Sequence, residues 1–272
     1  MRKYELTDET KTLDNGAVLR RIRAVRDFKL ADGTTVPAGK LGGWIENESN
    51  LSHDGKAWVS GEACVYDNAM VYSDAHVMGW AEVCGNACVY GNAQVFGDAR
   101  IEGAANVCGD AWVSGRASVC GYARVCDAAS VYDQATISDS ASVSGRAEVH
   151  GAAVVCDCAK VYEHAKVYDN ACVCGEAEVC FKAEVSGRAK VCGDAKVRST
   201  SDYATYKNTW SSGRWFTYTR SNGMWAVGCF HGTGEALITK AYKDSERSGR
   251  CYETIVRAQE AIDGETVEGE TT

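Results

Sequence analysis

The segment AKVYDNACVCGEAEVC, residues 165–180, predicts the fold, because alanine and valine recur in it at fixed intervals. On both sides of this segment, alanine occupies every sixth position from Ala57 to Ala195, and valine or isoleucine follows two places later, from Val59 to Val197. The array holds 24 units without an insertion. Six is not a helical period, whereas residues two apart in an extended strand share a face. Each unit therefore predicts a short strand with Ala and Val pointing inward.

Glycine or aspartate commonly stands two places after the valine, where the chain must turn. Glycine accepts a positive φ without penalty, and aspartate tolerates it. Three strands and three corners make one triangular coil, so the 24 units predict eight coils. At a strand spacing of about 4.8 Å these coils form a prism roughly 38 Å long. The sequence thus predicts an all-β solenoid, a parallel β-helix, over residues 51–198.

The composition excludes several other classes of protein. Leu, Ile and Phe supply only 19 residues, too few for a leucine-rich helical bundle. The chain has no apolar run of membrane-spanning length, and its charged start does not resemble a signal peptide. The net charge of −8 and the lack of a Lys/Arg block disfavour duplex nucleic acid. We expect a soluble, cytoplasmic protein whose 14 cysteines are reduced thiols.

A period of 18 residues sorts the outward side chains onto three faces. The first face, which starts at Trp58, is aromatic and mixed in charge. The second, which starts at Cys64, is the driest and carries most of the cysteines, serines and threonines. The third, which starts at Met70, carries tyrosines and many charges and is the most solvated. An exposed apolar face usually indicates a partner, so the second face is the candidate interface. The alternative is that its Ser, Thr and Cys residues simply favour strands and that the face is solvated.

Residues 1–50 do not keep the period and predict an N-terminal β cap. They include LADGTTV, whose Asp32-Gly33 predicts a hairpin tip, and GKLGGWIENESNLS, which leads into the first coil. We expect Trp44 and Ile45 to plug that coil. A cap protects strand ends that would otherwise expose hydrogen-bonding groups and valines.

Residues 199–262 predict a small α+β domain. The run 214–220 alternates, Asn222-Gly223 is a strong hairpin signal, and the run 224–230 is the returning strand. Apolar spacing predicts helices over 234–247 and 250–262, separated at Ser248-Gly249. The acidic residues 263–272 predict a flexible tail.

The array resembles the hexapeptide-repeat proteins, which form left-handed parallel β-helices; the handedness is implied by this resemblance. The cap segment LRRIRAVRDF, the array and the segment KNTWSSGRWFTYTRSNGMWAVGCFHGTGEALITKAY also resemble repeat proteins of phages and prophages of gut bacteria. The first resemblance implies a parallel homotrimer. The second implies a phage or prophage protein that acts in the bacterial cytoplasm.

No motif indicates catalysis, a metal site or a cofactor. Hexapeptide-repeat acyltransferases use a histidine between protomers as a general base, and His76, His150 and His164 lie in the array. However, such enzymes commonly interrupt the helix with a loop, and this register never breaks. Three histidines spaced for zinc are absent. Cys156, Cys174 and Cys192, with Cys158 and Cys172 nearby, spread along a line, so we interpret them as small residues on a packed face.

The hairpin carries the candidate ligand site. Arg214, Phe216, Tyr218 and Arg220 share one sheet face with Trp225, Val227 and Cys229. Aromatic rings stack on bases and arginine binds phosphate, so this face predicts a nucleotide or other planar anion as ligand. The alternative is that these aromatics form the core of a two-layer domain with arginines at its rim. The predicted ligand-binding residues are Arg214, Tyr218, Arg220, Trp225, Lys207 and Trp210.

These features favour a non-enzymatic phage accessory protein. Its trimer captures a small anionic ligand, such as a nucleotide signal of host immunity, or a host protein. The first alternative is a structural component of a virion fibre or spike. The second is an acyl-CoA-dependent acyltransferase.

Overall fold

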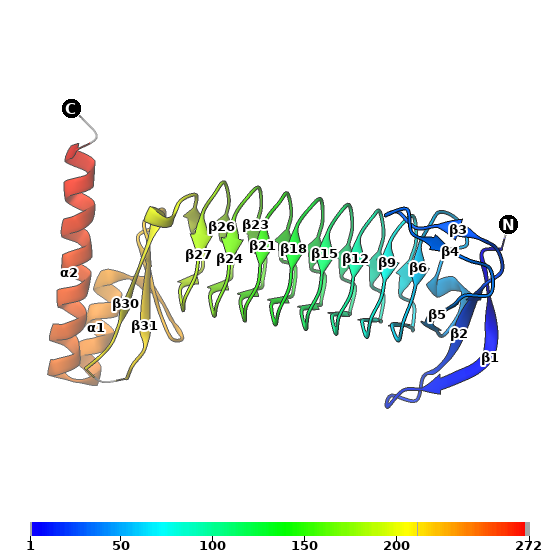
Figure 1. Ribbon diagram of the computed structural model, residues 1–272. Coiled ribbons are helices and arrows are strands. Elements are labelled where there is room, and N and C mark those ends of the chain that lie inside the picture. The colour runs from blue at the N-terminus through cyan, green and yellow to red at the C-terminus, as the bar shows by residue number, and fades with distance from the viewer. Residues whose placement is uncertain (1, 211, 270–272) are drawn as a thin grey trace.

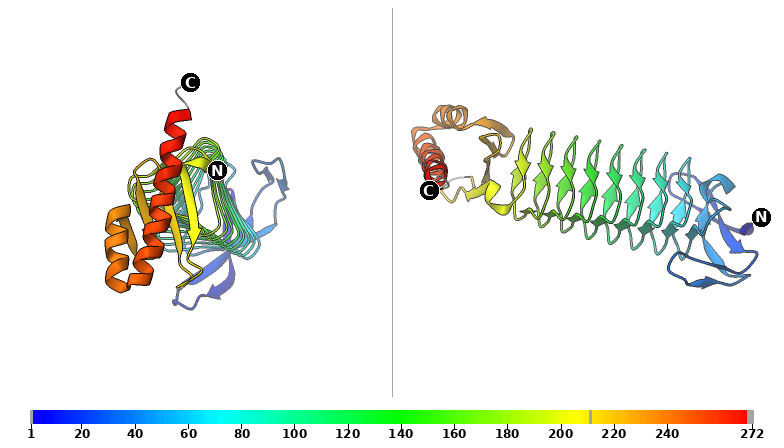
Figure 2. Two further views of the ribbon diagram at one scale, coloured as in Figure 1. Left: turned by 90° about the vertical axis from the view of Figure 1, so that its left-hand side faces the viewer. Right: turned by 90° about the horizontal axis from the view of Figure 1, so that it is seen from above.

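The computed structural model of the chain describes residues 2–210 and 212–269, and its central feature is a long parallel β-solenoid of about nine turns (Figure 1). Viewed along its axis, the turns lie over one another (Figure 2). The three faces follow the predicted order. Each rung is two residues long, and its valine or isoleucine is fully buried.

The rungs of the first face are β6 (Trp58–Val59), β9 (His76–Val77), β12 (Gln94–Val95), β15 (Trp112–Val113), β18 (Ser130–Val131), β21 (Glu148–Val149), β24 (Lys166–Val167) and β27 (Glu184–Val185). The rungs of the second face are β7 (Cys64–Val65), β10 (Glu82–Val83), β13 (Arg100–Ile101), β16 (Ser118–Val119), β19 (Thr136–Ile137), β22 (Val154–Val155), β25 (Cys172–Val173) and β28 (Lys190–Val191). The rungs of the third face are β8 (Met70–Val71), β11 (Cys88–Val89), β14 (Asn106–Val107), β17 (Arg124–Val125), β20 (Ser142–Val143), β23 (Lys160–Val161), β26 (Glu178–Val179) and β29 (Lys196–Val197).

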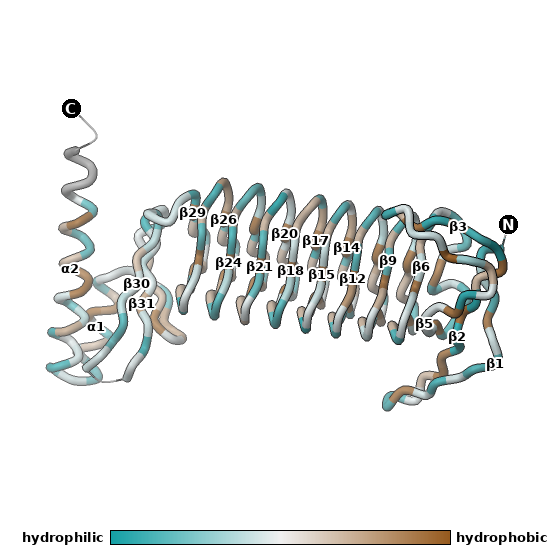
Figure 3. The backbone as a smooth tube through the Cα atoms, viewed as in Figure 1, coloured by the Kyte–Doolittle hydropathy of each residue, from teal (hydrophilic) through white to brown (hydrophobic). Residues whose placement is uncertain are grey.

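The interior is a stack of alanine and valine, as the spacing predicts. All 24 alanines and their valine or isoleucine partners belong to one buried cluster. Backbone bonds tie each turn to the next; the N–H of Ser130, for example, donates to the carbonyl of Ala147 at 2.9 Å. Apolar and polar residues alternate along the turns (Figure 3).

The corners explain why aspartate replaces glycine in the repeat. Both residue types stand there at positive φ, as predicted. An aspartate also accepts a hydrogen bond from the next turn: Asp127 Oδ2 receives the N–H of Gly145 at 3.0 Å, and Asp157 Oδ2 that of Gly175 at 2.9 Å. The carboxylate therefore compensates for the strain of the left-handed backbone.

The N-terminal cap adds the extra rung. β5 (Leu41–Ile45) pairs in parallel with β7, Ile45 lying beside Val65, and Leu51 forms a bridge to Val71. The solenoid therefore begins before residue 51. The predicted count of eight turns missed this rung because its offset is 20 residues and Gly43 stands in the place of alanine. A Cβ on Gly43 would lie 2.7 Å from the carbonyl oxygen of Ala63.

The rest of the cap closes the first turn. β1 (Tyr4–Thr12) and β2 (Val18–Ala24) continue the second face as antiparallel strands. β3 (Phe28–Lys29) and β4 (Thr35–Val36) form the predicted hairpin, followed by the 3-10 turn η1 (Glu48–Asn50).

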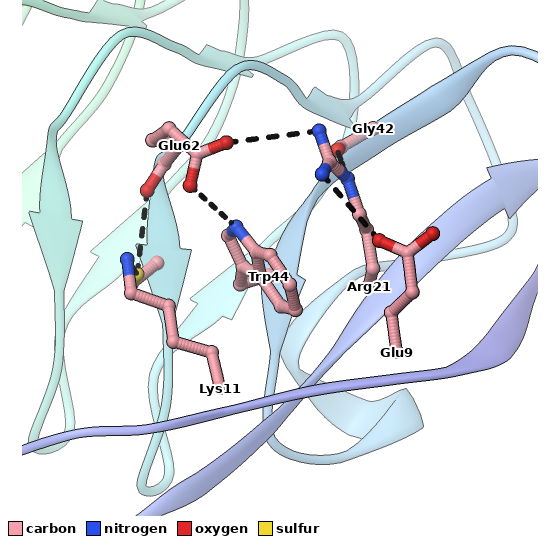
Figure 4. Close-up of polar contacts among 7 residues, drawn as sticks. Glu9, Lys11, Arg21, Gly42, Trp44 and Glu62 are labelled. Atoms are coloured by element: carbon pink, nitrogen blue, oxygen red, sulfur yellow. Dashed lines mark hydrogen bonds and ion pairs between the residues drawn. The ribbon is translucent and has the colours of Figure 1, made fainter.

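The prediction that Trp44 and Ile45 both plug the coil is half right. Ile45 is fully buried in the core, but Trp44 points outward beneath the β1–β2 hairpin because it takes the alternate position on its strand. Its indole donates to Glu62 Oε2 at 3.0 Å, with Arg21 over the ring (Figure 4).

The C-terminal domain covers the last turn. It follows the 3-10 turn η2 (Thr200–Asp202) and consists of an antiparallel sheet, β30 (Tyr203–Lys207), β31 (Trp215–Thr219), β32 (Met224–Val227) and β33 (Phe230–Thr233), with α1 (Gly234–Asp244) and α2 (Glu246–Gly269). One face of the sheet packs on the helices through Phe216, Trp225 and Val227. From the other, Thr217 Oγ1 accepts the N–H of Lys190 at 2.8 Å.

The predicted helix boundaries are wrong at two places. The break lies at Ser245, whose Oγ accepts the N–H of Ser248 at 3.1 Å, and α2 runs through Gly249. Gly249 allows close helix packing, since a Cβ there would lie 2.2 Å from the Tyr242 ring. Residues 263–269, predicted as flexible tail, continue α2, anchored by the Arg220–Asp263 ion pair at 3.3 Å. Residues 270–272 lie outside the described part.

Candidate functional site

A groove runs along the corner that follows the third face, beside the last turns of the solenoid. We call this edge corner 3; its residues follow β20, β23 and β26. The groove has a volume of about 570 Å³. It is lined by Gly145, Arg146, Glu163, His164, Phe181, Lys182 and Arg198.

The groove is basic although the chain is acidic. Arg146, His164 and Lys182 occupy equivalent positions on successive turns, which are spaced at about 4.8 Å, and all three are exposed. Arg198 is also exposed, at the end of the last turn. Within residues 2–210 and 212–269, Arg146, Lys182 and Arg198 take part in no ion pair. Their charges therefore remain available to an anion.

This basic character is local to the C-terminal half of corner 3. The equivalent positions on earlier turns are occupied by Asp74, Asn92, Asp110 and Ala128. The same edge thus changes from acidic to basic along the solenoid. A repeat that served only to turn the chain would not require such a change.

Phe181 lies in the middle of the groove in a strained conformation. Its φ is +56°, and the residue is 53% exposed. Other positive-φ corner residues are mainly glycine or aspartate, and the aspartates often bond the next turn. A phenylalanine side chain forms no such hydrogen bond, so only the contacts of a ring that is 53% exposed offset a strain of about 1–3 kcal/mol. Strain of this kind points to a functional role.

Glu163 supports Phe181 from the preceding turn. It also adopts a positive φ, +60°, and its Oε2 accepts the N–H of Phe181 at 2.6 Å. The carboxylate that would oppose an anion in the groove is therefore held by the backbone. The Phe181 ring therefore lies in a groove with three cations that form no ion pair, namely Arg146, Lys182 and Arg198.

The hairpin residues predicted to bind the ligand do not form an open site. Trp225 is 1% exposed and packs in the domain core, with Tyr218 tilted against it at 5.0 Å between ring centroids. The shared face was predicted correctly, since Tyr218 lies opposite Trp225. The prediction that it remains open was wrong, because the sheet needs its aromatic face to pack on α1 and α2.

The other predicted residues are dispersed. Lys207 lies 5.8 Å from the centroid of the Trp215 ring on β31. Trp210 packs near Phe216 at 6.3 Å. Arg220 pairs with Asp263, and Arg214 is exposed at the rim of the domain. The alternative of an aromatic core with arginines at its edge therefore describes this domain.

The three histidines considered for acyl transfer lie in three different environments. His76 Nε2 and Ser60 Oγ are hydrogen-bonded at 2.8 Å, and burial lowers the pKa of His76. His150 is stacked between Tyr132 and Tyr168, at 4.7 and 5.2 Å. Only His164 lines the groove.

The expectation that all cysteines are reduced is wrong for one pair. Cys108 and Cys126 form a disulfide on the third face, with their Cα atoms 4.6 Å apart. They occupy the same position on adjacent turns. Stacking of equivalent residues on adjacent turns brings their Cα atoms into disulfide range.

Apart from His164, which was considered for acyl transfer, the residues that form the groove were missed in the sequence, but a signal for them exists. Glu163 and Phe181 interrupt the Gly/Asp pattern at the corner position on consecutive turns. The period of 18 residues places Arg146, His164 and Lys182 beside them.

Within the described residues, the helices are too short or too polar to cross a membrane. Comparison of the chain with protein-family models and with curated proteins gives no match. The groove at corner 3 must therefore be interpreted from its own chemistry.

Proposed function

We propose that the chain is a non-enzymatic binding protein whose groove at corner 3 captures a small anion with a planar ring, such as a nucleotide. The observation that carries this proposal is the exposed, strained Phe181 among unpaired cations. An aromatic ring offers a stacking surface to a base, and arginine binds phosphate through two parallel hydrogen bonds.

The groove supplies complementary contacts for the two parts of such a ligand. The base stacks on Phe181, and the phosphates lie against Arg146, Lys182 or Arg198. Stacking contributes about 1–3 kcal/mol, and a hydrogen bond to a charged group about 1.5–3 kcal/mol. One stacking contact and two charged contacts together contribute about 4–9 kcal/mol, which corresponds to a Kd between about 1 mM and about 0.3 μM before the entropy cost of binding is subtracted.

We propose capture rather than turnover because Glu163, the acid beside the ring, is already bonded to the backbone. In a phage or prophage setting, capture in the bacterial cytoplasm would remove a nucleotide signal of host defence. This setting comes from the resemblance of the repeat and cap segments.

We further propose that the solenoid assembles as a homotrimer through the second face. Its middle rungs, from β16 to β22, carry uncharged, half-buried side chains. These are Ser118, Cys120, Thr136, Ser138, Val154 and Cys156. A parallel trimer would leave each corner 3 groove with its own ring and cations.

Isothermal titration with a panel of cyclic and linear nucleotides tests the proposal. The wild type is expected to bind at least one of them, and raising the salt concentration should weaken binding because the contacts are ionic. The variant Arg146→Ala should bind more weakly, whereas Tyr122→Ala, an exposed aromatic at another corner, should bind as the wild type does. No heat with any nucleotide, or equal binding by Arg146→Ala, would contradict the proposal.

A further inference from the structure

A cleft lies where the C-terminal domain meets the last two turns of the solenoid. We call it the junction cleft, and its volume is about 420 Å³. Asn170 and Arg188 line it from corner 1, which is the corner that follows the first face, and Lys190 lines it from β28. Arg214 and Trp215, at the start of β31, line it from the domain. The cleft lies beyond the rungs from β16 to β22 that the proposed trimer uses.

The cleft exists because the domain covers the last turn unevenly. At corner 2, which follows the second face, a Cβ on Gly193 would lie 2.7 Å from the His231 ring. At corner 1, apart from the chain neighbours of Gly187, no atom of the described residues lies within 4 Å of the position that its Cβ would take. The last corner 1 is therefore left open beside the domain.

Three cations line the junction cleft, and no acidic side chain of the described residues does. Arg188 and Arg214 are exposed, and Lys190 is half-buried. Lys190 is held in place, because its ammonium donates to the carbonyl of Gly228 at 3.3 Å and its N–H donates to Thr217 Oγ1. In the described part of the chain, none of the three cations takes part in an ion pair. Cations gathered without a counter-charge repel one another, so an anion in the cleft would stabilise the junction.

The backbone at corner 1 adds a hydrogen-bond donor to the cleft. On earlier turns, the residue at this position donates its N–H to the following turn: Ala152 donates to the carbonyl of Asp169 at 2.6 Å, and Asn170 to that of Gly187 at 2.9 Å. Arg188 stands on the last turn, so no turn follows it, and none of the described residues accepts its N–H. An anion oxygen can take the place of the carbonyl that the next turn would supply.

We propose that the junction cleft binds a linear phosphate chain of two or more phosphate groups, either free or as part of a nucleotide, through Arg188, Lys190 and Arg214. Arginine binds phosphate oxygens through two parallel hydrogen bonds, and lysine binds them as a point charge. The cations reach the cleft from both the solenoid and the domain, so a chain with several negative charges contacts more of them than a single phosphate does. The site is separate from the groove at corner 3 and does not depend on the aromatic ring there.

Isothermal titration with inorganic tripolyphosphate tests the proposal. Tripolyphosphate has no ring to stack on Phe181, so its binding does not depend on the function proposed for the groove. We expect the wild type to bind it more tightly than inorganic phosphate, and Arg146→Ala, which alters the groove, to retain this binding. A nucleoside triphosphate titrated into Arg146→Ala distinguishes the two sources of the chain. It should bind at least as tightly as tripolyphosphate if the chain belongs to a nucleotide, and more weakly if the chain is free.

Two variants decide whether the junction cleft is the site. Arg188→Gln with Arg214→Gln should weaken tripolyphosphate binding by about tenfold or more, because each arginine loses charged hydrogen bonds. The matched control is Arg116→Gln, an exposed arginine at the same corner position four turns earlier; it should bind as the wild type does. Without tripolyphosphate, the double variant should melt no lower than the wild type, because the substitutions relieve repulsion between cations.

Four results would overturn the proposal. The first is undiminished tripolyphosphate binding by the double variant, and the second is an equal loss of binding in Arg116→Gln. The third is loss of binding in Arg146→Ala, which would place tripolyphosphate in the groove at corner 3. The fourth is a double variant that melts lower than the wild type without the anion, which would show that the two arginines themselves hold the junction together.

Discussion

Replacing Phe181 with glycine distinguishes a role of this residue in the stability of the solenoid from a role in ligand binding. Glycine adopts the φ of +56° without strain, so the substitution removes the feature that the proposed ligand uses while keeping the corner. The backbone N–H that Glu163 accepts remains in place. The solenoid should therefore remain folded, whereas ligand binding should become weaker.

The expected cost in stability is small because opposing effects nearly cancel. Relief of the left-handed conformation stabilises the fold by about 1–2 kcal/mol. Loss of the contacts of a ring that is 53% exposed costs about 2 kcal/mol. The greater freedom of glycine in the unfolded chain costs a further ~0.5–1 kcal/mol. The net destabilisation is about 1 kcal/mol, whereas Phe216→Ala, in the core of the C-terminal domain, should cost about 3–5 kcal/mol.

Thermal unfolding and nucleotide titration of the two variants measure these effects. Loss of stacking should weaken binding by Phe181→Gly by about 5- to 150-fold, corresponding to ~1–3 kcal/mol. If Phe181→Gly is as unstable as Phe216→Ala, the ring is a structural element. If it binds nucleotide as the wild type does, Phe181 has no part in the site. Either result would refute the reasoning.

Two further predictions concern the cap and the corners. Burial lowers the pKa of Lys3 to about 8 from 10.5, so between these pH values the unfolded chain binds more protons than the folded chain. The wild type should therefore gain stability relative to Lys3→Met as the pH rises through this range. Urea unfolding of both proteins at the two ends of the range measures the difference in stability, and a difference that does not change with pH would contradict the prediction. Gly103→Ala should destabilise the solenoid by roughly 1–3 kcal/mol more than Gly187→Ala. Both glycines have a positive φ, but of the two only Gly103 would place a Cβ against the next turn, 2.9 Å from the Gly121 nitrogen. Equal melting temperatures of the two variants would show that the turns move apart freely.

Much of the fold could be predicted because the repeat is local and regular. The spacing of Ala and Val determines which residues point inward, and Gly or Asp marks each corner. The rung at β5 could not be found in this way, since its link to the next turn is 20 residues long and uses Gly43. The period is lost although the same packing continues.

Whether the hairpin face is open or buried could not be predicted, because that depends on packing between segments distant in the sequence. The pairing of Tyr218 with Trp225 follows from the hairpin turn, but which face of the sheet the helices cover does not. The break at Ser245 likewise depends on a side-chain cap and on close packing at Gly249. By contrast, Phe181 departs from a strict pattern, and that departure was visible in the sequence.

Native mass spectrometry tests directly whether the groove at corner 3 captures a nucleotide. The wild type and Phe181→Gly would be purified in parallel from cells of the natural host, and each spectrum read for assembly and retained mass. We predict that the wild type carries a small anionic adduct of nucleotide mass that the variant lacks, with both in the same oligomeric state. An adduct retained equally by both proteins, or by neither, would contradict capture in the groove at corner 3.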